Sequence, residues 1–130
     1  MADLGGRYAA YTARLVDRVL TAPGETPSDL RRAVLAQAAR LGGGRDPTAG
    51  PTSGEAVPAE LGTYVDKVAR HAHKVTDEEV TALQRAGTSD DALFEVTVSA
   101  ALGAALGRLE RGLAALRGEP RSVSERDEER

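Results

Sequence analysis

One uninterrupted helical pattern decides the fold, and it reads SDDALFEVTVSAALGAALGRLERGLAALR over residues 89–117. Ser89 is expected to cap this helix, and Asp90 and Asp91 favour the positive end of its dipole. Gly118 predicts its end. The spacing predicts an inward-facing stripe of ten residues: Leu93, Phe94, Val96, Thr97, Ala101, Leu102, Ala105, Leu109, Leu113 and Leu116. Such a stripe is long enough to anchor a helical bundle.

Four shorter amphipathic patterns precede this helix along the chain. Apolar residues recur every three or four positions in each, and the predicted helices cover residues 7–21, 26–41, 58–75 and 76–87. Thr26 is expected to cap the second helix by accepting a hydrogen bond from the Asp29 amide. Thr76 and Glu79 form the pattern of a capping box at the start of the fourth. The sequence therefore predicts an all-α, single-domain bundle of about five helices.

We expect this single domain to have four parts. They are an N-terminal helical hairpin (1–41), a flexible Gly/Pro-rich loop (42–55), a helical core unit (56–118) and a disordered, mixed-charge tail (119–130). A loop of this length is unusual inside a compact domain. It either marks an insertion beside a functional face or separates a detachable hairpin from the C-terminal helices.

The composition argues against several classes of function. The 130-residue chain has 17 basic and 20 acidic residues and a net charge of −3, so nucleic acid is not an expected partner. It has no cysteine, which removes disulfides, thiolate nucleophiles and thiolate metal sites. The N-terminus has no signal-like pattern and the chain has no long uncharged run, so we expect a cytoplasmic protein that does not enter a membrane.

The apolar residues are mostly small, which favours association between copies of the chain. One Phe, three Tyr and no Trp leave a modest core built from Ala, Leu and Val. On the long helix, Ser99, Gly103 and Gly107 recur every four residues and form a seam that another backbone can approach closely. The seam packs a neighbouring helix either in the same chain or in a second copy, and ligand binding is the alternative. We expect a homo-oligomer.

The two histidines, His71 and His73, are the candidates for metal or acid–base chemistry. On a continuous helix, residues two apart point about 200° away from each other and cannot share one ion without a third ligand. The alternative is that they only end a helix, where a histidine favours the dipole. The acidic runs 77–79 and 90–91 are explained by helix capping alone. We therefore expect no metal and no cofactor.

The segments 64–69, 75–80 and 83–93 resemble the core helical unit of the alkylhydroperoxidase D / carboxymuconolactone decarboxylase family. They read YVDKVA, VTDEEV and LQRAGTSDDAL, and the closest likeness is the Ala-Gly-x-Ser-Asp-Asp turn that precedes a long Ala/Leu helix. The resemblance implies an all-helical fold and assembly as trimers or hexamers.

The resemblance also places the family's functional positions on this chain. The two family cysteines correspond to Ala72 and Val75, the histidine to Glu79 and the glutamate to Glu60, so only Glu60 keeps the family's residue. A peroxidatic thiolate cannot be replaced by a methyl group. The chain is therefore not expected to be a thiol peroxidase.

Two main functions are open at this point. The first is a non-peroxidatic, oligomeric member of this family that acts as a scaffold or partner-binding protein. The second is an enzyme or small-molecule binder that reuses the family's cleft, with Glu60 and His71 or His73 as acid/base groups. Glu79 is a further candidate catalytic residue. A histidine within hydrogen-bond reach of Glu60 favours the enzyme, and projection of these side chains into bulk water favours the scaffold. A regulatory helical adaptor is a third hypothesis, supported only by size and charge.

Overall fold

The computed structural model describes residues 6–48 and 56–118, and all regular structure in these two ranges is helical. The elements in chain order are the 3-10 turn η1 (Gly6–Tyr8), α1 (Ala9–Thr21), α2 (Ser28–Leu41), α3 (Ala59–His71), the 3-10 turn η2 (Ala72–Lys74), α4 (Asp77–Arg85) and α5 (Asp90–Leu116). The all-α bundle of five helices predicted from the sequence is confirmed for the described residues.

Two helix starts follow the local sequence rules. At α4, the Thr76 hydroxyl accepts a hydrogen bond from the Glu79 amide while the Glu79 carboxylate accepts one from the Thr76 amide, which completes the capping box. At α5, the Ser89 hydroxyl accepts from the Ala92 amide. Both caps were predicted because each depends only on residues within the first turn.

Two other helix ends differ from the predictions. α3 ends at His71 rather than near residue 75, because the backbone leaves the helical region there, with φ −145° and ψ 53°. α2 begins at Ser28 with Pro27 in the cap position and no side-chain cap. Thr26 does not cap α2, because its hydroxyl donates instead to Glu95 on α5.

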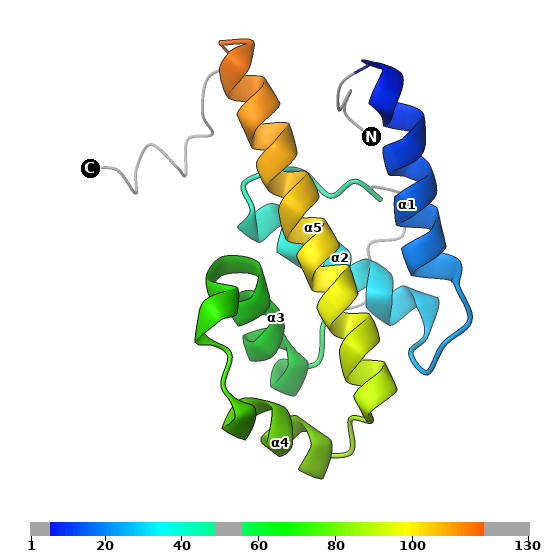
Figure 1. The fold of residues 1–130 in the computed structure, drawn as a ribbon, viewed down its shortest axis with the longest axis vertical. Helices are drawn as coiled ribbons and strands as arrows, with labels where there is room; N and C mark the ends of the chain where they lie inside the picture. The colour runs from blue at the N-terminus through cyan, green and yellow to red at the C-terminus, as the bar shows by residue number, and fades with distance from the viewer. Residues whose placement is uncertain (1–5, 49–55, 119–130) are drawn as a thin grey trace.

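Helix α5 lies across the front of the bundle in Figure 1, with α2 behind it, α1 on one side and α3 and α4 on the other. Among the described helices, α2 and α5 make the most extensive contact. At Gly103 and Gly107 a Cβ would overlap the carbonyl oxygens of Leu35 and Ala39, and Ser99 is fully buried. The small-residue seam of α5 thus packs against α2 of the same chain, which makes α2 a central element of the bundle.

Two hydrophobic clusters fill the space around this α2–α5 contact. The larger joins α2, α3, α4 and α5 through Val34, Ala38, Leu61, Tyr64, Val65, Ala69, Leu83, Leu93, Val96, Ala100 and Ala104. The smaller joins α1, α2 and α5 through Val16, Leu20, Leu35 and Leu106. α1 is therefore held by a minor cluster at one side of the bundle.

The inward-facing stripe predicted for α5 is wrong at half of its positions. The residues that α5 buries are Leu93, Val96, Ser99, Ala100, Gly103, Ala104, Leu106 and Gly107. Five of the ten predicted residues are exposed: Phe94, Ala101, Ala105, Leu109 and Leu116. The prediction failed because α5 is apolar on two opposite faces, and a spacing of three and four fits either face.

The first part of the segment expected to be a flexible loop packs on α5. The Gly44 amide donates to the Ala39 carbonyl, and the Arg45 amide donates to the Glu110 carboxylate at 3.0 Å. Residues 49–55, the rest of that loop, and the predicted tail 119–130 lie outside the described residues.

By length and composition alone, α5 is apolar enough to cross a membrane, and no other described helix is. In the bundle, 44% of its apolar window is buried against other helices. The core helix of a soluble protein can pass the same test.

Candidate functional site

The proposed acid/base groups lie apart from one another. Glu60 is the second residue of α3 and His71 is the last, so about 16 Å of helix separates them at 1.5 Å per residue. His73 lies in η2, beyond the C-terminal end of the same helix. All three side chains are exposed to solvent. The structure therefore does not bring Glu60 and a histidine together into one catalytic pair.

The two histidines do lie beside each other, contrary to the prediction from helical geometry. Their ring centroids are 6.3 Å apart and the rings meet edge to face, at 86°. The cause is the break at His71, which replaces the expected helix by a 3-10 turn. No third ligand joins them, since no group of three His, Asp or Glu residues able to hold a metal ion exists in the part of the chain that the structure describes.

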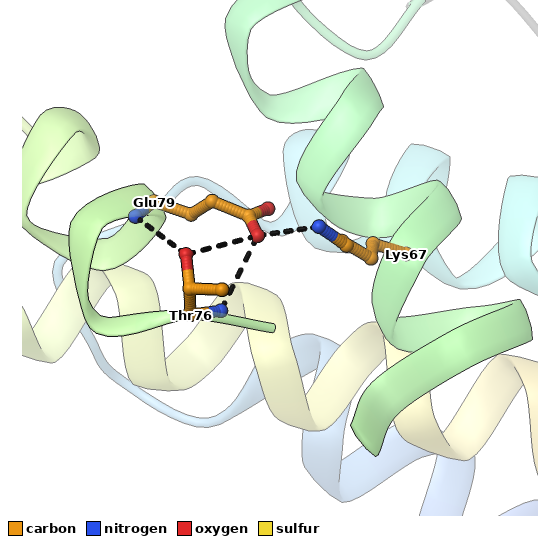
Figure 2. Close-up of polar contacts among 3 residues, drawn as sticks. All are labelled: Lys67, Thr76 and Glu79. Atoms are coloured by element: carbon orange, nitrogen blue, oxygen red, sulfur yellow. Dashed lines mark hydrogen bonds and ion pairs between the residues drawn. The ribbon is translucent and has the colours of Figure 1, made fainter. Parts of the chain in front are cut away.

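Glu79, which the sequence resemblance aligned with the family's histidine, belongs to a polar cluster at the α3–α4 turn (Figure 2). One carboxylate oxygen accepts hydrogen bonds from Lys67 at 2.5 Å and from the Thr76 hydroxyl at 3.1 Å. The hydrogen bond from Lys67 and those from Thr76 hold the pKa of Glu79 below its ordinary value. A carboxylate held ionised in this way stabilises the turn and is a poor proton donor.

Ala72 and Val75, which the sequence resemblance aligned with the family's two cysteines, lie just before this cluster. Ala72 begins η2, Val75 follows it, and the Val75 amide donates to the Ala72 carbonyl at 3.2 Å. Neither side chain carries a polar atom, so the turn holds an ion pair and a capping box without a thiol.

A second polar cluster, centred on Glu95, was not predicted. Its carboxylate accepts hydrogen bonds from the backbone amides of Glu25 and Thr26, both at 2.8 Å, and from the Thr26 hydroxyl at 2.5 Å. The Thr26 hydroxyl is the main cause of a pKa held below its ordinary value for Glu95. The cluster ties the α1–α2 loop to α5 across about 70 residues of sequence, so no local pattern could reveal it.

Arg31 lies next to the same loop and is buried, with only 6% of its surface exposed. Its guanidinium donates to the carbonyl oxygens of Val19 at 2.7 Å and Thr26 at 3.2 Å, while its Nε has no hydrogen-bond partner. The sequence indicated that Arg31 is buried, because Arg31 lies four residues before the core residue Leu35 on the same helix face. Arg31 is a structural group that joins α1 and α2.

The most prominent surface feature among the described residues is an apolar face on α5. Its members are exposed except for Val98, which is half-buried, and none of them is charged: Phe94, Val98, Ala101, Ala105, Leu109, Gly112 and Leu116. Phe94 is 70% exposed and Leu116 is 85% exposed. Isolated apolar residues on a surface are ordinary, whereas a large contiguous apolar patch is typical of surfaces that contact proteins, membranes or ligands.

Helix α1 extends this face. Tyr8 at the end of η1 and Tyr11 and Leu15 on α1 are each more than half exposed. Tyr11 and Leu15 lie about 100° to 140° around α1 from its buried residue Val16. The apolar face of α5 lies about 60° to 140° around α5 from its buried residue Leu106, in the same rotational sense. α1 and α5 run antiparallel (Figure 1) and share one hydrophobic cluster. In this arrangement the helical angles place both sets of residues on the same side of the bundle.

Arginines form a polar edge around the tyrosines. The guanidinium of Arg7 lies 4.9 Å from the ring centre of Tyr8, and that of Arg14 lies 4.9 Å from the ring centre of Tyr11. An arginine stacked on a tyrosine in this way leaves the ring able to contact a partner, and it keeps the positive charge at the margin of the apolar face. An apolar centre with Tyr and Arg at its margin is the composition of protein–protein interfaces.

Comparisons of the chain with protein-family models, with curated proteins and with solved structures found no match.

Proposed function

We propose that the chain is a non-enzymatic helical protein that works by binding a protein partner through the apolar face of α5 and the adjoining tyrosines of α1. We propose further that it is a non-peroxidatic member of the alkylhydroperoxidase D / carboxymuconolactone decarboxylase-like family, on the resemblance of residues 64–93. The observation that carries the binding role is the uninterrupted apolar row from Phe94 to Leu116.

The exposure of this surface supports the proposal. Six large apolar residues of η1, α1 and α5 are between 43% and 85% exposed: Tyr8, Tyr11, Leu15, Phe94, Leu109 and Leu116. Large apolar side chains are costly to leave in water, which favours a covering partner.

The polar groups support the same conclusion. Glu60, His71 and His73 project into solvent, as expected for a scaffold, and Glu79 and Glu95 are occupied by structural hydrogen bonds. The Glu79 carboxylate fixes the α3–α4 turn, and the Glu95 carboxylate fixes the α1–α2 loop. The exposed surface of the described residues therefore offers contact area rather than convergent chemical groups.

Site-specific photo-crosslinking tests this function in the cells that produce the protein. The photoreactive analogue p-benzoylphenylalanine would replace Phe94 in one strain and the exposed Ala82 of α4 in a control strain. We expect irradiation to join the Phe94 position to a discrete protein and to leave the Ala82 position unreacted. Adducts to lipid alone, or equal yields at both positions, would refute a protein-binding role for the face.

A further inference from the structure

The apolar face of α5 has a spacing that is the same when counted from either end. Its seven residues are separated by 4, 3, 4, 4, 3 and 4 positions, so Ala105 lies at the centre, eleven residues from both Phe94 and Leu116. Eleven residues make about three full turns, so these three side chains lie nearly in line along the helix. The face therefore runs straight for about 33 Å and is symmetric about Ala105.

Side-chain sizes along the face match under a two-fold rotation at Ala105. If a second α5 lies antiparallel on the first, the facing pairs are Phe94 with Leu116, Val98 with Gly112, Ala101 with Leu109, and Ala105 with itself. Each of the inner pairs contains at least one small residue, which lets the two backbones approach closely. The outer pair joins two large side chains, which close the ends of the contact.

The distribution of charge along α5 favours the same antiparallel orientation. Between residues 90 and 107 the helix has three acidic residues and no basic one, whereas between 108 and 117 it has three arginines and one glutamate. Antiparallel pairing places the acidic first turn of each helix, Asp90 and Asp91, near Arg117 of the other, and it also opposes the helix dipoles. Parallel pairing would place the two acidic first turns side by side.

From these three observations we infer that the partner covering this face is a second copy of the chain, paired antiparallel through α5 about a two-fold axis at Ala105. This inference rests on the proposed function and names its partner. An interface of this symmetry uses the same surface on both copies, so a self-matching row is what it requires. Two-fold pairing gives a dimer, or a hexamer built of three such pairs, and it excludes a simple closed trimer.

Because the chain has no cysteine, a single introduced thiol reports on this geometry without interference. In the pair, residue 105 of one copy faces residue 105 of the other, within the about 4.4 to 6.8 Å between Cα atoms that a disulfide needs. We expect Ala105→Cys to form a disulfide-linked dimer under mild oxidation. The matched control is Ala115→Cys, an exposed alanine of the same helix whose two copies would lie about 30 Å apart.

The expected result is a rate of crosslinking at least about tenfold higher for Ala105→Cys than for Ala115→Cys, since pairing raises the effective concentration of the thiols. Register is tested by mixing two variants. Ala101→Cys should crosslink to Leu109→Cys faster than to itself, because residues 101 of the two copies are about 12 Å apart along the axis. Equal rates for Ala105→Cys and its control, or faster crosslinking of Ala101→Cys to itself, would overturn the inference.

The test separates this inference from the proposed function. If the Ala105 thiols fail to crosslink while the photoreactive group at Phe94 captures a different protein, self-pairing is wrong and the binding role stands. If neither experiment joins the face to protein, both are wrong. Capture of lipid at Phe94 together with binding to phosphatidylcholine–phosphatidylglycerol vesicles would also refute both, and would assign α5 to a membrane surface.

Discussion

Gly103 on α5 lies directly against the carbonyl oxygen of Leu35 on α2, and no side chain fits between the two backbones. A Cβ at this position would also come within 3.0 Å of the Ala38 side chain. A glycine inside a helix costs about 1 kcal/mol relative to alanine. The close approach of α2 and α5, made inside one chain, is the physical reason for a glycine in the middle of the longest helix.

Gly103→Ala should therefore destabilise the fold although alanine is the better helix former. The overlap is with a backbone oxygen that cannot move aside, so we expect a loss of about 1 to 3 kcal/mol in the free energy of unfolding. Gly62→Ala on α3 is the matched control, because nothing lies within 4 Å of its added Cβ, and it should gain about 0.5 to 1 kcal/mol. Urea denaturation of both variants checks the prediction, and a stabilised Gly103→Ala would contradict it.

Glu95→Gln should weaken the attachment of the α1–α2 loop in a manner that depends on pH. The pKa of Glu95 is lowered in the folded chain, so its contribution to stability is fully present above its ordinary value of 4.5 and is lost as pH falls through the folded value. We expect Glu95→Gln to lose about 1 to 2 kcal/mol at pH 7 and to show a flatter decline in acid.

Denaturation curves at pH 7, 4 and 3 measure this effect. Glu78→Gln, at an exposed position of α4, is the control and should keep the slope of the unsubstituted chain. An identical dependence on pH for Glu95→Gln and the unsubstituted chain would show that the Glu95 hydrogen bonds do not persist in solution.

The sequence was sufficient for features that depend on neighbouring residues. The cap at Ser89 and the capping box of Thr76 and Glu79 form within one helical turn, so their residue types and spacing define them. The helix count followed in the same way from apolar spacing. The prediction for Thr26 failed because Glu95, far away in the sequence, competes for its hydroxyl.

The candidate binding face could be found only with the structure. Phe94, Ala105 and Leu109 fit the helical spacing of a buried stripe, and in a helix that is apolar on two opposite faces the sequence cannot say which face meets the bundle. Packing decides it, because Gly103 and Gly107 allow the approach of α2 on the opposite side. For Arg31 the sequence indicated the buried helix face, but only the structure shows its partners, the carbonyl groups of Val19 and Thr26.

The purified protein should not reduce hydroperoxides. No cysteine is present to form a sulfenic acid, and Ala72 and Val75 occupy the positions that the family resemblance assigns to its thiols. Assays with cumene hydroperoxide and dithiothreitol should give the rate of buffer alone, before and after removal of contaminating peroxiredoxin. Turnover that persists through this removal and scales with protein concentration would contradict the prediction.

Ala105→Glu should separate the paired copies without unfolding them. The side chain is exposed in the single chain, so helix content should be unchanged, but pairing would place two carboxylates opposite each other at the two-fold axis. We expect association to weaken by at least about 100-fold, since facing like charges cost several kcal/mol. Ala115→Glu, about 80° around the same helix, carries the same charge outside the apolar face.

Light scattering and circular dichroism on these two variants compare assembly with folding. We expect the Ala115→Glu protein to assemble as the unsubstituted chain does. Equal assembly of both variants, or loss of helix content in Ala105→Glu alone, would count against an exposed pairing face at Ala105.

Sedimentation equilibrium of the unsubstituted protein measures whether two copies pair through α5. Standard interfaces bind with micromolar or tighter affinity, so measurements between about 1 and 100 μM cover the range where pairing should appear. We expect twice the 13.6 kDa mass of one chain, or a higher even multiple. A mass of 13.6 kDa throughout this range, or a mass three times as large, would contradict pairing through α5.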